Sequence, residues 1–406
     1  MISVEKAVEI VLGEAKPLPS MAVMIESSKG YILSEPVRAD IDFPPFDRVM
    51  MDGYALEASR SGEGVILPVD GVIGAGEYRE ETVPDGHCVK IMTGASLPRG
   101  TNAVIRVEMT SVTGDGKVRL GAKIEPGDNV AMCGEEVKKG TVLLPAGTVA
   151  DSAAVSVMAM AGCRKTNVYK IPSLGILPTG SELVKPSRKI PSRGKIRDSN
   201  TYGLIVQCLT WGGLPVRLGN PGDESGDLSR YIEKGLGCDI LVISGGVSMG
   251  DYDLVPAVLQ DLGVEVIFHK VSQKPCKPLL FGKRGNTYVF GLPGNPVAVY
   301  LGFELYVGPM IRRLSGEEDF RTRWFRGMAT GDFKIKSDRT QFIPCRIEWE
   351  DRRWNAYPVE SKGSADIFSV VGTNAFARFN KGAYTVRSNE EVDFFFTRGC
   401  LYGTQR

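Results

Sequence analysis

Two short segments have the hydrophobic spacing of amphipathic helices. In residues 3–12 the apolar positions recur every three or four residues, which places them on one helix face, and Ser3 before them is a typical N-cap. Residues 151–162 are a run of small and apolar residues, with Asp151 at its start and Gly162 at its end. We therefore predict two helices with these residues as caps.

The pattern changes in residues 54–140, where short apolar runs are separated by Gly, Pro and Asp. Short apolar runs between turn signals are typical of β-strands. Residues 320–406 show the same pattern. The sequence therefore predicts two small β domains, and we expect the first one to be antiparallel.

Between these β regions, residues 172–315 alternate between strand-like runs and helical segments. Such alternation predicts a parallel, doubly wound sheet. Near its end, the runs PLLFG and TYVFGL predict a hairpin, and a final helix is predicted with Asn295 as cap and Pro296 at its first position. The predicted fold class is multidomain α/β plus β, with a central doubly wound parallel sheet.

Unusual polar segments follow the predicted strands of this central region. They are residues 178–184, 220–225, 245–253 and 291–296. In an open α/β sheet, ligands bind in the crevice beyond the carboxyl ends of the strands. Four such segments together favour one shared ligand site over four unrelated turns.

Of these segments, 245–253, GGVSMGDYD, has the most residues suited to bind a ligand or a metal. Gly245 and Gly246 let the backbone approach a ligand closely, as in phosphate-binding loops, although an ordinary joint between strand and helix is the alternative. Asp251 and Asp253 follow, and one of them, paired with Asp223 across the crevice, is suited to hold a hydrated Mg²⁺. A single Asp at this place more commonly caps the next helix.

The segment KVSQKPCKP carries Lys270, Lys274 and Lys277. Lys274 and Lys277 each precede a proline, which favours polyproline geometry, and residues three apart then share one face. We expect the two ammonium groups to form an anion clamp; a solvated basic edge strand is the alternative. The next helix start, at GLPGNPV, would add free backbone amides for an anion.

Composition narrows the chemistry further. The chain has 406 residues, enough for two to four domains. Its formal net charge of +1 provides no overall field to attract nucleic acid or a membrane surface, so we expect neither as a partner. The eight cysteines show no zinc-type spacing and predict reduced thiols in the cytoplasm, and no signal peptide is expected. Neither of the two histidines lies near a nucleophile motif, which leaves carboxylates, lysines and backbone amides.

One stretch, DFPPFDRVMMDGYAL at residues 42–56, fits neither helix nor strand. We expect its prolines to hold the chain extended, and Phe43, Phe46 and the methionines to bind it to apolar surface. An interdomain linker is the alternative interpretation. The rigid presentation of Asp52 is the feature that a linker leaves unexplained.

Taken in order, these segments resemble the MoeA family, the molybdopterin molybdenumtransferases, which include the E domain of gephyrin. The matching motifs are PPFDRVMMDGYAL, IMTGASLPRGTNAVI, GEEVKKGTVLLPAGT, GILPTGSELV, IRDSNTYGL, SGGVSMGDYDLV, KPCKPLLFG and GLPGNPVA. The order of so many motifs is far more specific than any one of them.

The resemblance implies a homodimer whose subunits have four domains. These would be an elongated linker and dimerisation domain (1–53 and 140–171), a small β domain (54–139), an α/β domain similar to molybdopterin adenylyltransferase (172–319) and a C-terminal β-barrel (320–406). The implied activity is insertion of molybdate into adenylylated molybdopterin, with Mg²⁺-dependent release of AMP. Molybdopterin adenylyltransferase would be the upstream donor, and the crevice would face the Asp52 segment of the other subunit.

The resemblance also implies roles for individual residues. The implied catalytic residues are Asp52, Thr93, Glu136 and Glu182. The implied substrate-binding residues are Asp198, Gly245, Gly246, Ser248, Lys270, Lys274, Lys277, Pro293, Asn295, Pro296, Arg346 and Ser364. The implied metal ligands are Asp223 and Asp253.

The chain departs from the family's usual pattern at a few places. The segment 130–133, VAMC, lacks the usual arginine, Glu136 replaces Asp, Cys276 replaces Gly, and Arg48 and Val49 replace small or polar residues. These departures leave a catalytically altered paralogue as one alternative to the enzyme. The others are a gephyrin-like scaffold, a tungstate-inserting homologue and an adenylyltransferase acting one step earlier.

Overall fold

The computed structural model describes residues 1–187, 189, 191–221, 225–247 and 254–397. The chain forms two compact units. Unit 1 comprises Met1–Val23, Ser28–Ser34 and Asn167–Arg406, and unit 2 comprises Met24–Ser27 and Glu35–Thr166.

A six-stranded sheet in the order β17-β14-β18-β22-β21-β19 forms the centre of unit 1. Its strands are β14 (Ser173–Pro178), β17 (Leu214–Arg217), β18 (Ile240–Ser244), β19 (Glu265–His269), β21 (Leu280–Arg284) and β22 (Thr287–Leu292). The first three pairs along this order are parallel, and the last two are antiparallel. The predicted parallel sheet and its hairpin are both confirmed.

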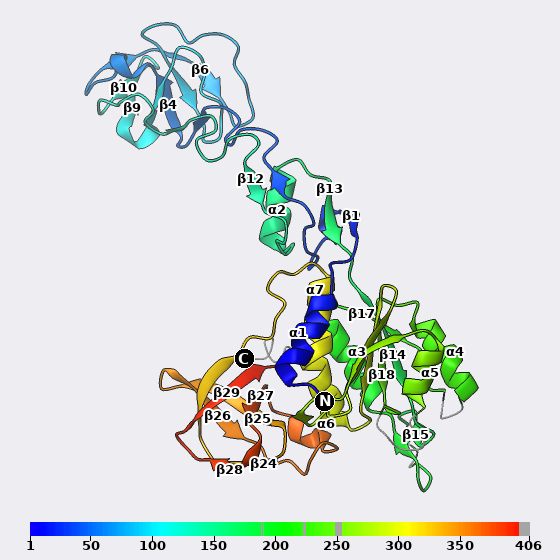
Figure 1. Cartoon of the computed structure of the whole chain (residues 1–406). Helices are drawn as coiled ribbons and strands as arrows, with labels where there is room; N and C mark the ends of the chain where they lie inside the picture. Colours follow the sequence, from blue (N-terminus) through cyan, green and yellow to red (C-terminus); the bar gives the residue numbers. More distant parts are fainter. Residues whose placement is uncertain (188, 190, 222–224, 248–253, 398–406) are drawn as a thin grey trace. The chain divides into compact units, whose positions relative to one another are not determined.

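Helices cover both faces of this sheet, as a doubly wound fold requires. They are α1 (Val4–Glu14), α3 (Asn200–Thr210), α4 (Ser225–Gly235), α5 (Val255–Asp261), α6 (Pro296–Gly302) and α7 (Gly308–Leu314). Along β14, Leu174 and Ile176 belong to the core formed with α1, α3, α6 and α7, whereas Leu177 belongs to the core formed with α4 and α5. Figure 1 shows α3 and the α4–α5 pair on opposite sides of β14 and β18.

The predicted helix caps are present. The Ser3 hydroxyl accepts a hydrogen bond from the Lys6 amide at 3.2 Å at the start of α1. In unit 2, the Asp151 carboxylate accepts one from the Ala154 amide at 2.8 Å at the start of α2 (Ser152–Met160). Both side chains satisfy a backbone donor that the helix itself leaves unpaired.

The final helix of the α/β region differs from the prediction. A π-helical segment, Phe303–Val307, separates α6 from α7. Asn295 occupies the N-cap position of α6, but its side chain makes no capping hydrogen bond. Its amide group donates instead to the Ser364 hydroxyl at 2.8 Å, because a loop of the C-terminal region lies against the helix start.

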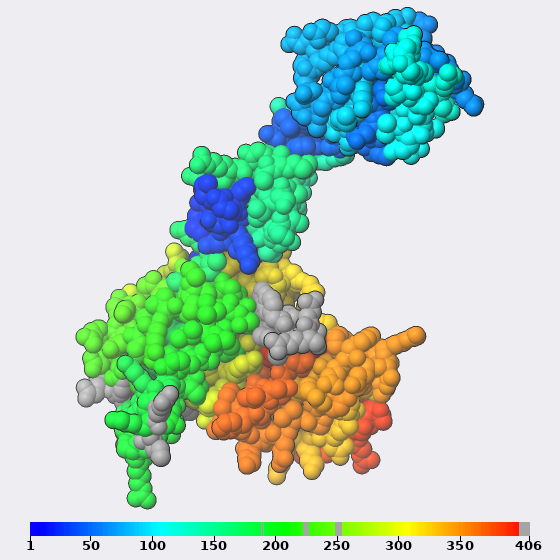
Figure 2. Space-filling view, turned by 180° about the vertical axis from the view of Figure 1, so that it is seen from behind, coloured from blue at the N-terminus to red at the C-terminus, as the bar shows by residue number. Residues whose placement is uncertain are grey.

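The C-terminal part of unit 1 is a closed five-stranded barrel, which confirms the prediction. The order β25-β26-β23-β29-β27 closes through an additional β25–β27 pairing. Its strands are β23 (Phe325–Ala329), β25 (Thr340–Glu350), β26 (Arg353–Pro358), β27 (Ala375–Phe379) and β29 (Glu391–Phe396). Strand β20 (Gln273–Lys274) pairs with β25 outside the barrel. Two further pairs form small sheets of their own: β24 (Phe333–Ser337) with β28 (Gly382–Val386), and β15 (Leu183–Val184) with β16 (Ile196–Arg197). The barrel, orange to red, and the green sheet region lie side by side in unit 1 (Figure 2).

Unit 2 is built mainly from strands. A four-stranded sheet has the order β6-β7-β4-β8, and a three-stranded sheet has the order β5-β10-β9. The strands are β2 (Val37–Arg38), β3 (Arg48–Val49), β4 (Gly53–Leu56), β5 (Ile66–Leu67), β6 (Val69–Ile73), β7 (Cys88–Ile91), β8 (Ala103–Arg106), β9 (Thr110–Val112), β10 (Val118–Leu120), β11 (Val130–Ala131) and β12 (Val142–Leu144). Strand β1 (Ser20–Met24), which belongs to unit 1 up to Val23, pairs with β13 (Lys165–Tyr169), which belongs to unit 1 from Asn167.

The expectation of a purely antiparallel first β domain is wrong at one pair. Strands β6 and β7 are parallel, whereas β4 pairs with β7 and β8 in the antiparallel sense. Residues 74–87 connect β6 to β7, and a connection of this length permits the crossover that parallel strands need.

No helix within the described part of the chain is long and apolar enough to cross a membrane. The four-domain division remains a prediction.

Gly53 provides a test of the packing in unit 2. A Cβ at this position would lie 2.0 Å from the backbone oxygen of Ile105 on the paired strand β8. We expect Gly53→Ala to destabilise unit 2 by about 1–3 kcal/mol, measured by chemical denaturation. Gly13→Ala is the control, because a Cβ there meets nothing within 4 Å and helix α1 gains up to about 1 kcal/mol. Equal stability of the two variants would contradict the β4–β8 pairing.

Candidate functional site

A cleft of about 1270 Å³ lies in unit 1 between the carboxyl edge of the parallel sheet and the barrel. The ends of three strands contribute to its wall: Thr179 and Gly180 follow β14, Gly245 follows β18, and Pro293 follows β22. The prediction that the polar segments meet at the strand ends holds for these three. They meet because parallel strands present their carboxyl ends at one edge.

Hydrogen bonds hold the three loops of this wall together. The Thr179 amide donates to the Ser244 carbonyl at 2.9 Å, and the Gly245 amide donates to the Leu292 carbonyl at 2.9 Å. The Asn200 side-chain amide donates to both the Ser244 hydroxyl, at 2.9 Å, and the Gly294 carbonyl, at 2.8 Å. Asn200 thereby ties the start of α3 to two strand ends.

Gly245 and Gly246 both line the cleft and both have positive φ, +99° and +64°. A Cβ at Gly245 would lie 2.8 Å from the Thr179 carbonyl oxygen. The glycines therefore also allow the β14 and β18 loops to pack closely, which the sequence interpretation, centred on a ligand, did not anticipate.

Lys274 and Lys277 also line the cleft, but the polyproline explanation for their common placement is wrong. Cys276 between them has φ of +70°, far from the polyproline value of about −75°. Lys274 ends the short strand β20, its ammonium donates to the Lys336 carbonyl at 3.1 Å, and the chain then turns at Pro275 and Cys276. The turn, and not a regular helix of three residues per turn, brings both lysines to the cleft.

Two buried side chains hold this lysine-bearing turn. The Gln273 side-chain oxygen accepts a hydrogen bond from the Tyr306 hydroxyl on the π-helical segment. Cys276 is buried, burial raises the pKa of its thiol to about 12, and its sulfur packs against Gly302 of α6, where a Cβ would lie only 3.0 Å away. Cysteine thus adopts a positive φ at the position where the family usually has Gly, with its side chain filling the core.

The barrel contributes further cations and hydroxyls to the cleft. Lys334, Arg339 and Ser364 line it. Arg346, predicted to bind substrate, does not: its guanidinium forms an ion pair with Glu348 at 3.1 Å and lies 4.8 Å from the centre of the Tyr357 ring.

Of the other residues predicted in unit 1, Glu182 and Asn295 line the cleft, whereas Asp198, Lys270 and Pro296 do not. Asp198 is buried and accepts a hydrogen bond from the Thr201 amide at 3.0 Å, which is a capping role at the start of α3. Lys270 has φ of +88°, and its amide donates to the Leu279 carbonyl at 2.9 Å.

We expected free backbone amides at the start of α6, but the first two residues of the helix, Pro296 and Val297, offer none. The Val297 amide donates to the Ser364 carbonyl at 3.0 Å, and Pro296 has no N–H group.

The residues predicted to hold the metal, Asp223 and Asp253, lie outside the described residues, as does Ser248. Within the ranges that the structure describes, no group of three or more His, Cys, Asp or Glu side chains could hold a metal ion. The described residues therefore do not by themselves supply a magnesium site.

Unit 2 brings together the predicted pair Asp52 and Thr93. The Asp52 carboxylate oxygen Oδ1 accepts hydrogen bonds from both the Thr93 amide and the Thr93 hydroxyl, each at 2.7 Å. The two hydrogen bonds hold the pKa of Asp52 below its ordinary value, the amide bond having the larger effect and nearby Lys90 adding a smaller one. Asp52 is therefore a rigidly presented, ionised carboxylate.

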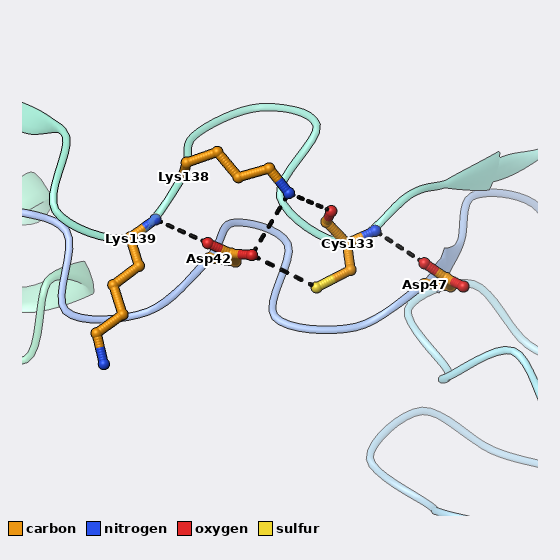
Figure 3. Close-up of polar contacts among 5 residues, drawn as sticks. All are labelled: Asp42, Asp47, Cys133, Lys138 and Lys139. Atoms are coloured by element: carbon orange, nitrogen blue, oxygen red, sulfur yellow. Dashed lines mark hydrogen bonds and ion pairs between the residues drawn. The ribbon is translucent and has the colours of Figure 1, made fainter.

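Glu136, the other predicted residue of unit 2, forms an ion pair with Arg48 at 3.0 Å. Its turn is held by two carboxylates of the opposite segment (Figure 3). Asp47 accepts a hydrogen bond from the Cys133 amide at 2.8 Å, and Asp42 accepts one from the Lys139 amide at 2.7 Å. The amide bond to Lys139 is the main cause of the lowered pKa of Asp42.

The apolar side chains of the segment 42–56 behave differently from the prediction. Phe43 is buried, but Phe46, Met50 and Met51 are 40%, 52% and 40% exposed. Of the side chains predicted to bind apolar surface, Phe43 is therefore the buried one. Further along the segment, Val49 and Leu56 are buried in the cores of unit 2, and the carboxylates Asp42 and Asp47 hold its start.

Three residues that line the cleft were not anticipated from the sequence: Asn200, Lys334 and Arg339. Asn200 lies in the motif IRDSNTYGL and is the first residue of α3, so the motif could have indicated that its side chain lies at a helix start near the strand ends. Lys334 and Arg339 lie in and beside a short strand of the C-terminal region, and nothing in that pattern indicates which face meets the cleft.

Three family models match consecutive parts of the chain. The MoeA N-terminal region (domain I and II) matches residues 2–162, the probable molybdopterin binding domain matches residues 175–313, and the MoeA C-terminal region (domain IV) matches residues 326–396.

Curated relatives match over nearly the whole chain. The molybdopterin molybdenumtransferase of Bacillus subtilis (strain 168) is 32% identical, covering 98% of this chain and 94% of its own length. The molybdopterin molybdenumtransferase of Staphylococcus aureus (strain Mu50) is 30% identical, covering 98% and 96%. A crystal structure of the molybdopterin biosynthesis MoeA protein from Pyrococcus horikoshii has a TM-score of 0.85 and 29% identity, covering 98% of this chain and 99% of that one.

The parallel sheet with its polar cleft, the closed barrel and these matches define a transferase of molybdenum cofactor biosynthesis. The chain belongs to the MoeA family, as its motifs led us to expect. The roles of the individual site residues remain predictions.

The contact between Asp52 and Thr93 generates a pH prediction. Because the folded-state pKa of Asp52 is lowered, this contact stabilises the fold above the ordinary carboxyl pKa, and the contribution is lost as the pH falls through the lowered value. We expect Thr93→Val to raise the pKa of Asp52 toward its ordinary value, because the hydroxyl donor is removed. Carboxyl-carbon NMR titration measures this shift.

Thr93→Ser is the matched control, because it keeps both the hydroxyl and the amide. A Thr93→Val variant whose Asp52 titrates as in the unmodified protein would show that the hydroxyl bond has no effect on the pKa.

Proposed function

We propose that this protein inserts molybdate into adenylylated molybdopterin and releases AMP. The observation that carries the proposal is the cleft in the molybdopterin-binding region, whose wall carries four cationic side chains: Lys274, Lys277, Lys334 and Arg339. Membership of the MoeA family supports the same reaction.

The cleft suits a phosphorylated ligand that also has a flat, partly apolar ring. The cations are positioned to bind phosphate oxygens, and the hydroxyls of Ser361 and Ser364 offer further hydrogen bonds. Phe342, Ile343 and Val297 give the cleft apolar surface beside these polar groups. Fixed cations stabilise the charge that develops on the phosphate as its anhydride bond breaks.

The carboxylates Asp52 and Glu182 are the proposed proton carriers. Insertion of molybdate releases oxygen as water, and each departing oxygen needs protons. Asp52 is held ionised by Thr93, so it starts in the form that a proton carrier needs, and its lowered pKa favours passing on a proton that it has taken up.

Mg²⁺ is the proposed cofactor. Asp223 and Asp253 are its proposed ligands, because carboxylate oxygens suit this hard cation, which would neutralise phosphate charge when bound. Since both residues lie outside the described ranges, no step is derived through the ion.

We further propose that the protein is a homodimer in which the cleft of one subunit uses the Asp52 segment of the other. Molybdopterin adenylyltransferase is the proposed upstream donor. The cytoplasm is the proposed compartment, since the cysteines in the described part of the chain are all free thiols.

The central test follows AMP release from adenylylated molybdopterin with Mg²⁺ and molybdate. We expect Asp52→Ala and Glu182→Ala each to lower the rate by about 10²–10⁴-fold, because a proton carrier is removed. Asp85→Ala is the control, since Asp85 is an exposed carboxylate paired with Arg60 outside the proposed site. No AMP release by the unmodified protein with molybdate or tungstate would contradict the enzyme and favour a scaffold.

Subunit mixing tests the shared site. Heterodimers of Asp52→Ala and Glu182→Ala subunits would carry one intact site, so random mixing should restore about a quarter of the unmodified activity. Sites completed within one subunit would give no recovery on mixing. Sedimentation velocity measures the dimer itself.

A further inference from the structure

In unit 2, the residues predicted for the site carry negative charge, which is unfavourable for binding an oxyanion. Two of these residues, Asp52 and Glu136, are acidic, and Asp52 is held ionised. Carboxylates alone repel an oxyanion such as molybdate or phosphate. The segment 130–133, Val-Ala-Met-Cys, supplies no cation to offset them, and nearby Lys90 has only a small effect on Asp52.

Arg48 lies where such a cation is needed. Strand β3 pairs antiparallel with β11, and Arg48 stands directly opposite Ala131. On its other side, Arg48 forms a β-bridge with Ser96, in the turn that begins at Thr93. Arg48 therefore lies between the turn of Thr93 and the strand that leads to Glu136.

Backbone bonds make this placement rigid. The Val49 amide donates to the Ala95 carbonyl at 3.0 Å, and the Gly94 amide donates to the Val49 carbonyl at 2.8 Å. The preceding residue, Asp47, holds the Cys133 amide (Figure 3). Both neighbouring segments are thus tied to β3, which fixes where the Arg48 side chain starts.

The Arg48 side chain is oriented by one hydrogen bond, and its guanidinium keeps further N–H donors for a ligand. Its Nη2 donates to Glu136 Oε1 at 3.0 Å, and this is the hydrogen bond that the structure records for the guanidinium. The Arg48 side chain is 41% exposed and that of Glu136 is 50% exposed. A guanidinium has five N–H donors in a planar fork, so a second edge remains for a ligand oxygen.

Stability does not explain the pair. An ion pair as exposed as this one contributes at most about 1 kcal/mol to folding. The pair therefore has a small structural role, and its removal should leave the fold intact.

We propose that Arg48 is an oxyanion-binding residue of the active site, with Glu136 orienting its guanidinium toward molybdate. This inference rests on the proposed function and adds to it a residue for recognition of the oxyanion. Glu136 fixes one edge of the fork, and the other edge donates to an oxygen of the anion.

The test compares Arg48→Ala with Arg60→Ala in the AMP-release assay at varied molybdate concentration. We expect Arg48→Ala to raise the KM for molybdate by about 10–100-fold, the effect of losing one charge-assisted hydrogen bond. Arg60 also forms an exposed ion pair in unit 2, with Asp85, so Arg60→Ala removes the same charge elsewhere and should leave this KM unchanged. Thermal unfolding should be unaffected in both variants.

The strand register offers a rescue. Residues directly opposite in an antiparallel pair project to the same face with Cβ atoms about 5 Å apart. Ala131 is buried opposite Arg48, so adding Ala131→Arg to Arg48→Ala exchanges the large and the small side chain of this pair and returns a guanidinium to the same face. We expect the KM for molybdate to recover at least in part. A folded double variant with no recovery would contradict the proposed position of the cation.

A binding experiment without turnover separates this inference from the proposed function. Equilibrium dialysis of the full chain with molybdate, and with inorganic phosphate as a second probe, should show weaker molybdate binding by Arg48→Ala. If the unmodified protein releases AMP and Arg48→Ala shows unchanged KM and unchanged molybdate binding, the inference is wrong while the function stands. Absence of AMP release from the unmodified protein would instead remove the function.

Discussion

The parallel strands β14, β18 and β22, buried on both faces, are the constraint on which unit 1 depends. All five residues of β18 are buried, and successive residues enter opposite cores, Val242 on the α3 side and Ile243 on the α4 side. A shift of one residue would exchange the two faces and is strongly opposed. The register therefore fixes the carboxyl edge, and with it the loops that form the cleft.

The cleft adds a second level of order, because polar contacts connect the sheet loops to the barrel. Asn295 at the start of α6 donates to Ser364, and the Lys274 ammonium donates to the Lys336 carbonyl. Each contact joins residues at least 62 positions apart in sequence. The cationic wall is therefore a product of tertiary structure, although its lysines are visible in a single motif.

This distinction explains what the sequence could predict. Periodicity was sufficient for the sheet, the barrel strands and the caps Ser3 and Asp151, because local patterning and burial agree there. Periodicity did not predict side-chain placement where contacts between distant parts of the chain determine it. Cys276 is buried against α6 with a positive φ that its neighbouring prolines do not indicate. Arg339, just before β25, lines the cleft, whereas Arg346, within β25, does not. The residues at 223, 248 and 253 lie outside the described ranges.

The exposed apolar side chains of unit 2 bear on the proposed dimer. Phe46, Met50 and Met51 precede the carboxylate Asp52 in the same segment and are each 40% or more exposed. Burying one such side chain gains about 1.5–3 kcal/mol, so leaving three exposed beside a rigidly held carboxylate is costly unless another surface covers them. A site completed by a second subunit would bury them and lower the local dielectric, which strengthens the interaction of an oxyanion with Arg48. The apolar residues would then form the subunit interface, and the ionic residues beside it would bind the oxyanion.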